Sequence, residues 1–175
     1  MIRRIISGGQ TGVDIAALDI AGSFHLARGG WCPKGRRCEV GVIPPCYELR
    51  ETPSSSYLQR TEWNVRDSDF TLVLYRVKLE GGSLATADYA TKLGRPHRCV
   101  DLMDQPDPEG IAELLSAVIT LNVAGTRASK AQGIWSDAYW FLHSVIQIQR
   151  IAEMKAAPQE KRPFEWDTPL KAWPA

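Results

Sequence analysis

Apolar residues along this chain follow two patterns, short uninterrupted runs and longer stretches at helical spacing. Four short runs have the length of buried strands: residues 2–6, 70–75, 97–102 and 120–124. Five stretches between and after them are predicted helices: residues 13–22, 57–67, 81–93, 111–119 and 133–154. Because strands and helices alternate, the pattern predicts a single α/β domain. We expect a three-layer α/β/α arrangement, a mainly parallel sheet with helices on both faces.

Two segments depart from this alternation. Residues 25–56 are predicted to be irregular, and they contain many glycines and prolines: Gly29, Gly30, Pro33, Gly35, Gly41, Pro44, Pro45 and Pro53. A loop of this length inside a compact domain is usually functional. The end of the chain contains Pro158, Pro163, Pro169 and Pro174, which exclude a continuing helix. We therefore expect a domain over residues 1–154 and an extended tail over 155–175, lying on the domain or on a neighbouring subunit.

Composition narrows the classes of function. The 175 residues carry a net charge of +1, which argues against binding of duplex nucleic acid. No run approaches the ~18 apolar residues of a membrane helix, and no signal-peptide core follows Met1. The four cysteines form no CxxC pair, so neither a zinc ribbon nor a disulfide framework is indicated. We expect a cytoplasmic protein with no resident metal, no membrane partner and no nucleic-acid partner.

The first predicted strand is followed by a glycine-rich turn: Ser7, Gly8, Gly9, Gln10, Thr11 and Gly12. Ligands of α/β sheets bind beyond the carboxyl ends of the strands, and the N–H groups of a helix N-terminus attract anions. Two adjacent glycines allow a phosphate or oxyanion to approach closely, and a branched residue at Gly9 is expected to block that approach. Thr11 is the expected N-cap. The turn has neither a GxGxxG nor a GK[ST] pattern, and a turn that serves only packing is the alternative.

Two other strand ends carry small, polar or charged residues. One set of candidate ligand-binding residues is Gly81, Gly82 and Ser83, and the other is Asn122, Ala124, Gly125 and Arg127. Arg127 is placed to hold an oxyanion with two parallel hydrogen bonds, although a solvated surface arginine is the alternative. Asp14 falls in the first turn of the predicted helix 13–22, where the helix dipole favours a carboxylate, so a purely electrostatic role is the simpler interpretation.

The irregular segment adds a cationic stretch with an aromatic residue inside it. Trp31, Lys34 and Arg36 are candidates for holding a polyanionic or flat heteroaromatic ligand, and a solvated charged face is the alternative. Four polar residues share roughly one face of the predicted helix 57–67: Arg60, Thr61, Asn64 and Asp67. We expect them to form a hydrogen-bond network that holds the long segment rather than to catalyse a reaction.

The sequence offers many groups that hold anions and few that transfer protons. The three histidines are isolated in the sequence, and no nucleophile stands beside a candidate base. This asymmetry favours a binding protein over an enzyme, with a small anionic molecule as its ligand.

Five segments, taken together, resemble the molybdenum cofactor carrier protein family. They are residues 7–14 (SGGQTGVD), 29–36 (GGWCPKGR), 59–69 (QRTEWNVRDSD), 81–82 (GG) and 121–125 (LNVAG), and the resemblance spans about residues 2–150. It implies a Rossmann-like domain, related to the lysine-decarboxylase-like (LOG) proteins, that assembles as a homo-oligomer, commonly a tetramer. It also implies that molybdenum cofactor is bound as cargo, stored, protected and passed to molybdoenzymes. One departure is Thr126, which stands where the family usually has proline.

The same relationship raises two alternative functions. LOG phosphoribohydrolases release the base from a nucleoside monophosphate, and their PGGxGTxxE segment supplies a reacting glutamate. The corresponding stretch here is residues 80–88 (EGGSLATAD), with the shorter Asp88 at the glutamate position. A misplacement of ~1 Å can lower a rate by about 100-fold, so this departure argues against the enzyme. The other alternative is a protein that senses a nucleotide without turning it over.

Overall fold

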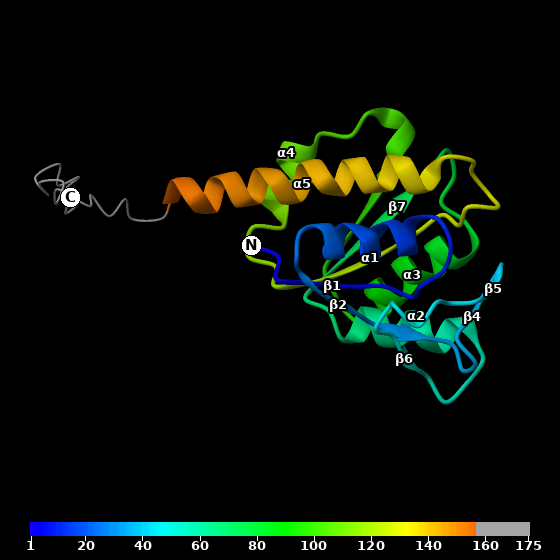
Figure 1. The fold of residues 1–175 in the computed structure, drawn as a ribbon. Helices are drawn as coiled ribbons and strands as arrows, with labels where there is room; N and C mark the ends of the chain where they lie inside the picture. Colours follow the sequence, from blue (N-terminus) through cyan, green and yellow to red (C-terminus); the bar gives the residue numbers. More distant parts are fainter. Residues whose placement is uncertain (157–175) are drawn as a thin grey trace, which may run out of the picture.

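The computed structural model describes residues 1–156 and contains a five-stranded parallel sheet (Figure 1). Its strands, in spatial order, are β2 (Ala27–Gly29), β1 (Arg4–Ile6), β9 (Thr120–Gly125), β7 (Phe70–Tyr75) and β8 (His97–Asp101). Every neighbouring pair runs parallel. The predicted single α/β domain with a parallel sheet is therefore confirmed. Of the extended tail expected over 155–175, residues 155 and 156 are helical instead, and the residues from 157 onward lie outside the described part of the chain.

Helices cover both faces of the sheet. Helices α1 (Val13–Ser23), α4 (Pro108–Leu114) and α5 (Ile134–Ala156) lie together on one face, and α2 (Tyr57–Arg66) and α3 (Gly81–Lys92) on the other (Figure 1). The core between the sheet and the first group contains alternate strand residues such as Ile5, Leu72 and Leu121, all fully buried. This alternation follows from the pleat, which points successive side chains to opposite faces. Among residues 1–156, no helix has the length and apolar character needed to cross a bilayer.

The structure corrects one predicted helix. The helix expected over 111–119 begins earlier and ends at Leu114. Asp107 caps its first turn by accepting hydrogen bonds from the N–H groups of Glu109 and Gly110 at 2.9 and 3.0 Å. The chain then turns through short-range backbone bonds, including one from the Val118 N–H to the Leu115 carbonyl at 3.1 Å, before entering β9. Leu115 and Val118 are buried in this turn, so their apolar character mimics a longer helix.

The segment 25–56 is more regular than its composition predicts. Strand β2 lies within it and forms one edge of the main sheet. The segment also contains two small paired units: β3 (Trp31–Cys32) with β6 (Arg50–Glu51), and β4 (Arg37–Cys38) with β5 (Gly41–Val42). The last pair is an antiparallel hairpin, whose tip is Glu39 and Val40. Strands of two or three residues are too short to show any hydrophobic period, which explains why the pattern missed them.

Candidate ligand-binding site

A cavity of about 440 Å³ lies beyond the carboxyl ends of β1, β9 and β7. These three strands supply it through the turns that follow them, the expected position for a ligand site in an α/β sheet. Its lining residues are Gln10, Asp14, Arg60, Arg76, Lys78, Glu80, Gly81, Gly82, Ser83, Thr86, Ala124, Gly125, Thr126, Arg127 and Lys130. The structure thus brings together candidates from all three strand-end segments that the sequence singled out.

Positive charge predominates in the lining of the cavity. Five cationic residues contribute, Arg60, Arg76, Lys78, Arg127 and Lys130, against the two acidic residues Asp14 and Glu80. The ammonium groups of Lys78 and Lys130 each lie 3.8 Å from the Glu80 carboxylate. A concave site with an excess of positive charge attracts anionic ligands.

The N-terminus of α3 faces this same cavity. Helix α3 begins at Gly81, and the Glu80 side chain before it makes no capping hydrogen bond. The first N–H groups of a helix have no partner within the helix, and they carry the positive end of its dipole. Ser83 and Thr86 line the cavity beside them, and both are buried. The start of α3 therefore provides a cradle for an anionic group.

A buried ion pair forms part of the cavity wall. The Arg60 Nη1 lies 3.2 Å from the Asp14 Oδ2. The Asp14 carboxylate also accepts a hydrogen bond from the Gln10 N–H at 3.1 Å. Burial nevertheless raises the pKa of Asp14 above its ordinary value, and the Arg60 charge and the hydrogen bonds oppose that rise. The pair holds the β1–α1 turn against α2.

The glycine-rich turn serves packing at several of its positions. The Ser7 hydroxyl donates to the Val123 carbonyl at 2.6 Å within the sheet. A Cβ at Gly8 would lie 1.7 Å from the Arg60 guanidinium, so this glycine makes room for that side chain. A Cβ at Gly9 would meet Leu49 at 2.5 Å, and Gly9 is not part of the cavity lining. A branched residue at Gly9 is therefore expected to disturb the packing of the 25–56 segment rather than to block a ligand.

Thr11 is not the N-cap of α1. Gly12 occupies that position with a φ of 80°, and it makes no side-chain capping bond. A Cβ on Gly12 would lie 2.5 Å from the Thr126 carbonyl oxygen, so the two turns are in close contact. The Thr11 hydroxyl instead donates to Glu39 at the hairpin tip. Thr11 does not cap α1 because its hydroxyl bonds to the neighbouring hairpin.

The cationic candidates of the 25–56 segment lie away from the cavity. The Arg36 side chain donates to four backbone carbonyls of its own segment, at Ile43, Pro44, Tyr47 and Leu49. Lys34 is exposed. Trp31 packs edge-to-face on Trp63, with ring centroids 4.7 Å apart, and it borders a smaller cavity of about 90 Å³. Arg36 therefore holds the segment together, and Trp31 packs it on α2.

Helix α2 holds this segment through its polar face. Asn64 accepts from the Trp31 N–H at 2.8 Å and donates to the Trp31 carbonyl at 2.9 Å. Asp67 accepts from the Trp31 indole N–H at 2.7 Å. The Thr61 hydroxyl donates within α2 to the Tyr57 carbonyl at 2.9 Å.

The buried Asn122 lies in the sheet, where it donates to the Thr71 hydroxyl at 3.2 Å, and it does not line the cavity.

Sequence reasoning did not single out several residues that line the cavity. Arg76 lies immediately after β7 and pairs with Asp137, and Lys130 lies in the turn after β9. Neither belongs to a recognisable motif. Their positions after strand ends were nevertheless a usable signal, because all loops at that end of a parallel sheet converge.

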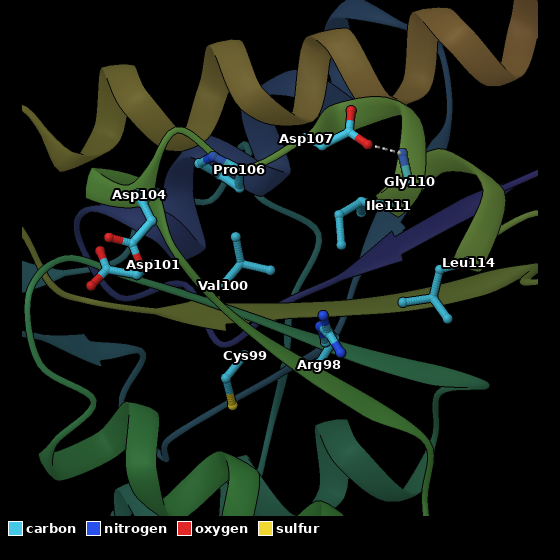
Figure 2. Close-up of a pocket in the computed structure, with 10 residues that line it drawn as sticks. All are labelled: Arg98, Cys99, Val100, Asp101, Asp104, Pro106, Asp107, Gly110, Ile111 and Leu114. Atoms are coloured by element: carbon cyan, nitrogen blue, oxygen red, sulfur yellow. Dashed lines mark hydrogen bonds between the residues drawn. The ribbon is translucent and has the colours of Figure 1, made fainter.

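A second cavity, of about 510 Å³, lies between the edge strand β8 and α4 (Figure 2). It is lined by Arg98, Cys99, Val100, Asp101, Asp104, Pro106, Asp107, Gly110, Ile111 and Leu114. Two of its carboxylates stabilise the local backbone. Asp107 caps α4, and Asp101 accepts a hydrogen bond from the Met103 N–H at 2.9 Å. Within residues 1–156, no cluster of three or more potential metal ligands occurs. The cavity at the strand ends is therefore the stronger candidate site.

Comparison with known proteins supports the relationship seen in the sequence. The sequence profile of the circularly permutated YpsA SLOG family (cpYpsA) matches residues 5–146. The fold is similar to the crystal structure of a "putative molybdenum carrier protein" from Syntrophus aciditrophicus SB. That protein is 41% identical in sequence, with a TM-score of 0.75, and the match covers 85% of this chain and 94% of the other. No curated protein is significantly similar to this chain in sequence.

Proposed function

Because this chain belongs to the circularly permutated YpsA SLOG family, we propose that the cavity at its strand ends binds molybdenum cofactor, or a closely related anionic pterin, as cargo. The role is to store and protect the cofactor and to pass it to molybdoenzymes. The observation that carries the proposal is the convergence of five cationic side chains and the α3 N-terminus on one cavity. The carrier name of the 41% identical neighbour supports the choice of cargo.

The chemistry of the cavity suits a ligand with two anionic groups. Molybdenum cofactor is a pterin that carries a terminal phosphate and a dithiolene-held molybdenum oxo centre. The α3 N-terminus, with Gly81, Gly82 and Ser83, is the proposed cradle for the phosphate. Arg127 and Lys130 line the cavity from the turn after β9 and are the proposed contacts for the second anionic group.

The competing function is hydrolysis of a nucleoside monophosphate. The carboxylate at the position of the reacting glutamate in such hydrolases does not lie in this cavity. Asp88 is exposed on α3 and does not line the cavity. The carboxylates that do line it are both engaged with cations, Asp14 with Arg60 and Glu80 with the two lysines. We therefore place binding ahead of hydrolysis.

The test is a calorimetric titration with anaerobically prepared molybdenum cofactor, run beside an identical titration with AMP. We expect the cofactor to bind one site per chain, and to bind more tightly than AMP. If AMP binds more tightly than the cofactor, the site is a nucleotide site and the carrier function is wrong. Release of free adenine from AMP would favour the hydrolase instead.

A further inference from the structure

The carboxylate of Glu39 sits in a corner where two turns of the chain meet. It accepts hydrogen bonds from the Ser129 hydroxyl at 2.5 Å, from the Ser129 N–H at 3.1 Å and from the Thr11 hydroxyl. The Arg127 Nε lies 3.9 Å from the same carboxylate. Two hydroxyls, a backbone N–H and a guanidinium thus converge on one anion. This is the set of donors that an oxyanion site requires.

We propose that the corner formed by Thr11, Arg127 and Ser129 is an oxyanion subsite of the cavity, which Glu39 fills until an anionic group of the ligand replaces it. The inference rests on the proposed binding of an anionic ligand in that cavity. Arg127 connects the two places, because it lines the cavity and also pairs with Glu39. A ligand that recruits Arg127 therefore competes directly with Glu39.

Gln10 provides a second connection between the cavity and Glu39. Its Oε1 accepts from the Glu39 N–H at 2.9 Å and from the Thr11 N–H at 3.1 Å. Since both neighbours are donors, the amide orientation is fixed with its oxygen toward them. Gln10 also lines the cavity and is only 5% exposed, and among residues 1–156 its Nε2 finds no acceptor. A buried donor without a partner is destabilising, and a ligand oxygen would supply the missing acceptor.

The hairpin that carries Glu39 is weakly held at its tip. Strands β4 and β5 pair at only two positions. Val40 and Val42 are 78% and 69% exposed, so lifting the tip uncovers little apolar surface. Its base is fixed separately by the bonds of Arg36 to backbone carbonyls. Displacing Glu39 therefore costs mainly its own hydrogen bonds, which an incoming oxyanion would replace.

Inorganic phosphate is the probe, titrated calorimetrically into the full chain and into two variants. Glu39→Gln removes the competing charge at similar size, and we expect phosphate to bind about ten-fold more tightly, the effect of one charge-assisted contact. Glu48→Gln is the matched control, because Glu48 is an exposed residue of the same segment and borders a different cavity. It should leave phosphate affinity as in the wild type. Unchanged or weaker binding by Glu39→Gln would mean that Glu39 only anchors the hairpin.

A double variant locates the bound phosphate. Adding Thr11→Val to Glu39→Gln removes one donor from the corner, and we expect the gain in affinity to disappear. If the double variant keeps the gain, phosphate binds elsewhere, for example at the α3 N-terminus, and the proposal is wrong. In the wild type, phosphate should also speed hydrogen exchange of amides 39–42. These outcomes do not depend on the identity of the cargo: a cavity that prefers AMP would contradict the carrier function while the corner still bound phosphate.

Discussion

The Arg60 guanidinium lies over the backbone of Gly8 and pairs with Asp14, with 3.2 Å between its Nη1 and the Asp14 Oδ2. The two side chains are only 11% and 2% exposed. One contact therefore explains three features of the sequence: a glycine that cannot carry a Cβ, an acid in the first turn of α1 and an arginine on α2. The ion pair fixes the β1–α1 turn beside the cavity.

Removing one member of this pair should destabilise the protein strongly. Asp14→Asn leaves the Arg60 charge buried without its partner, and we expect the free energy of unfolding to fall by about 3–5 kcal/mol. Urea denaturation monitored by circular dichroism measures the change. Asp88→Asn is the matched control, because Asp88 is exposed on α3 and should alter stability by less than about 0.5 kcal/mol. Equal stability of the two variants would show that the ion pair contributes nothing.

The sequence predicted the layers of the fold because those layers depend on hydrophobic pattern. The apolar run at residues 70–75 coincides with β7, and the helical spacing after Gly133 coincides with α5. The two-residue strands of the 25–56 segment had no such signal. Residues such as Leu115 were assigned to a helix because burial in a turn looks the same as burial in a helix.

Position along the chain selected residues that line the cavity more often than residue type did. The rule that ligands bind beyond strand ends selected Gln10, Gly81, Gly125 and Arg127, all of which line the cavity. Residue type alone selected Arg36, whose side chain donates hydrogen bonds to four backbone carbonyls of its own segment. Which cation faces a ligand and which faces the backbone depends on tertiary contacts that no local pattern encodes.

The contribution of Glu39 to stability should depend on pH. Although burial raises its pKa, hydrogen bonds from Ser129 and Thr11 and the charge of Arg127 hold that pKa below the ordinary value of 4.5. A carboxyl whose pKa is lower in the folded state stabilises the protein above its unfolded-state pKa, and this contribution is lost as the pH falls through the folded-state pKa. We expect the wild type to exceed Glu39→Gln by about 1 kcal/mol in unfolding free energy at pH 6–7. The difference should shrink below pH 4.5, and a difference that grows on acidification would contradict the assignment.

Helix α5 leads us to expect a homo-oligomer, with a tetramer favoured by the family resemblance. Tyr139 and Phe141 pack against the core, whereas Trp135 and Trp140 are 39% and 59% exposed. Exposed tryptophans are typical of an interface. Size-exclusion chromatography with light scattering should give a multiple of 19.5 kDa, and Trp140→Glu should shift the mass toward the monomer. A wild-type mass of 19.5 kDa at every concentration would refute the expectation.

Arg127 gives the sharpest test of the carrier function. Its side chain is 40% exposed, lines the cavity and lies 3.9 Å from Glu39, so it is free to turn toward a ligand. Arg127→Ala should weaken binding of molybdenum cofactor roughly ten- to a hundred-fold, because it removes one or more charge-assisted hydrogen bonds. Arg127→Lys should recover only part of that loss, since lysine keeps the charge but not the planar pair of donors.

The control for Arg127 is Arg98→Ala, which removes the same charge from the second cavity beside β8 (Figure 2). Calorimetry with anaerobic cofactor should show that Arg98→Ala binds it with wild-type affinity. Circular dichroism should show an unchanged fold for Arg127→Ala, Arg127→Lys and Arg98→Ala. A general loss of positive charge would weaken Arg98→Ala and Arg127→Ala alike, and only modestly, through screened long-range attraction. A contact at the cavity weakens Arg127→Ala alone. Equal affinity of the wild type and Arg127→Ala would exclude Arg127 from the site, and the second anionic group of the ligand would then have to bind through Lys130 or the start of α3.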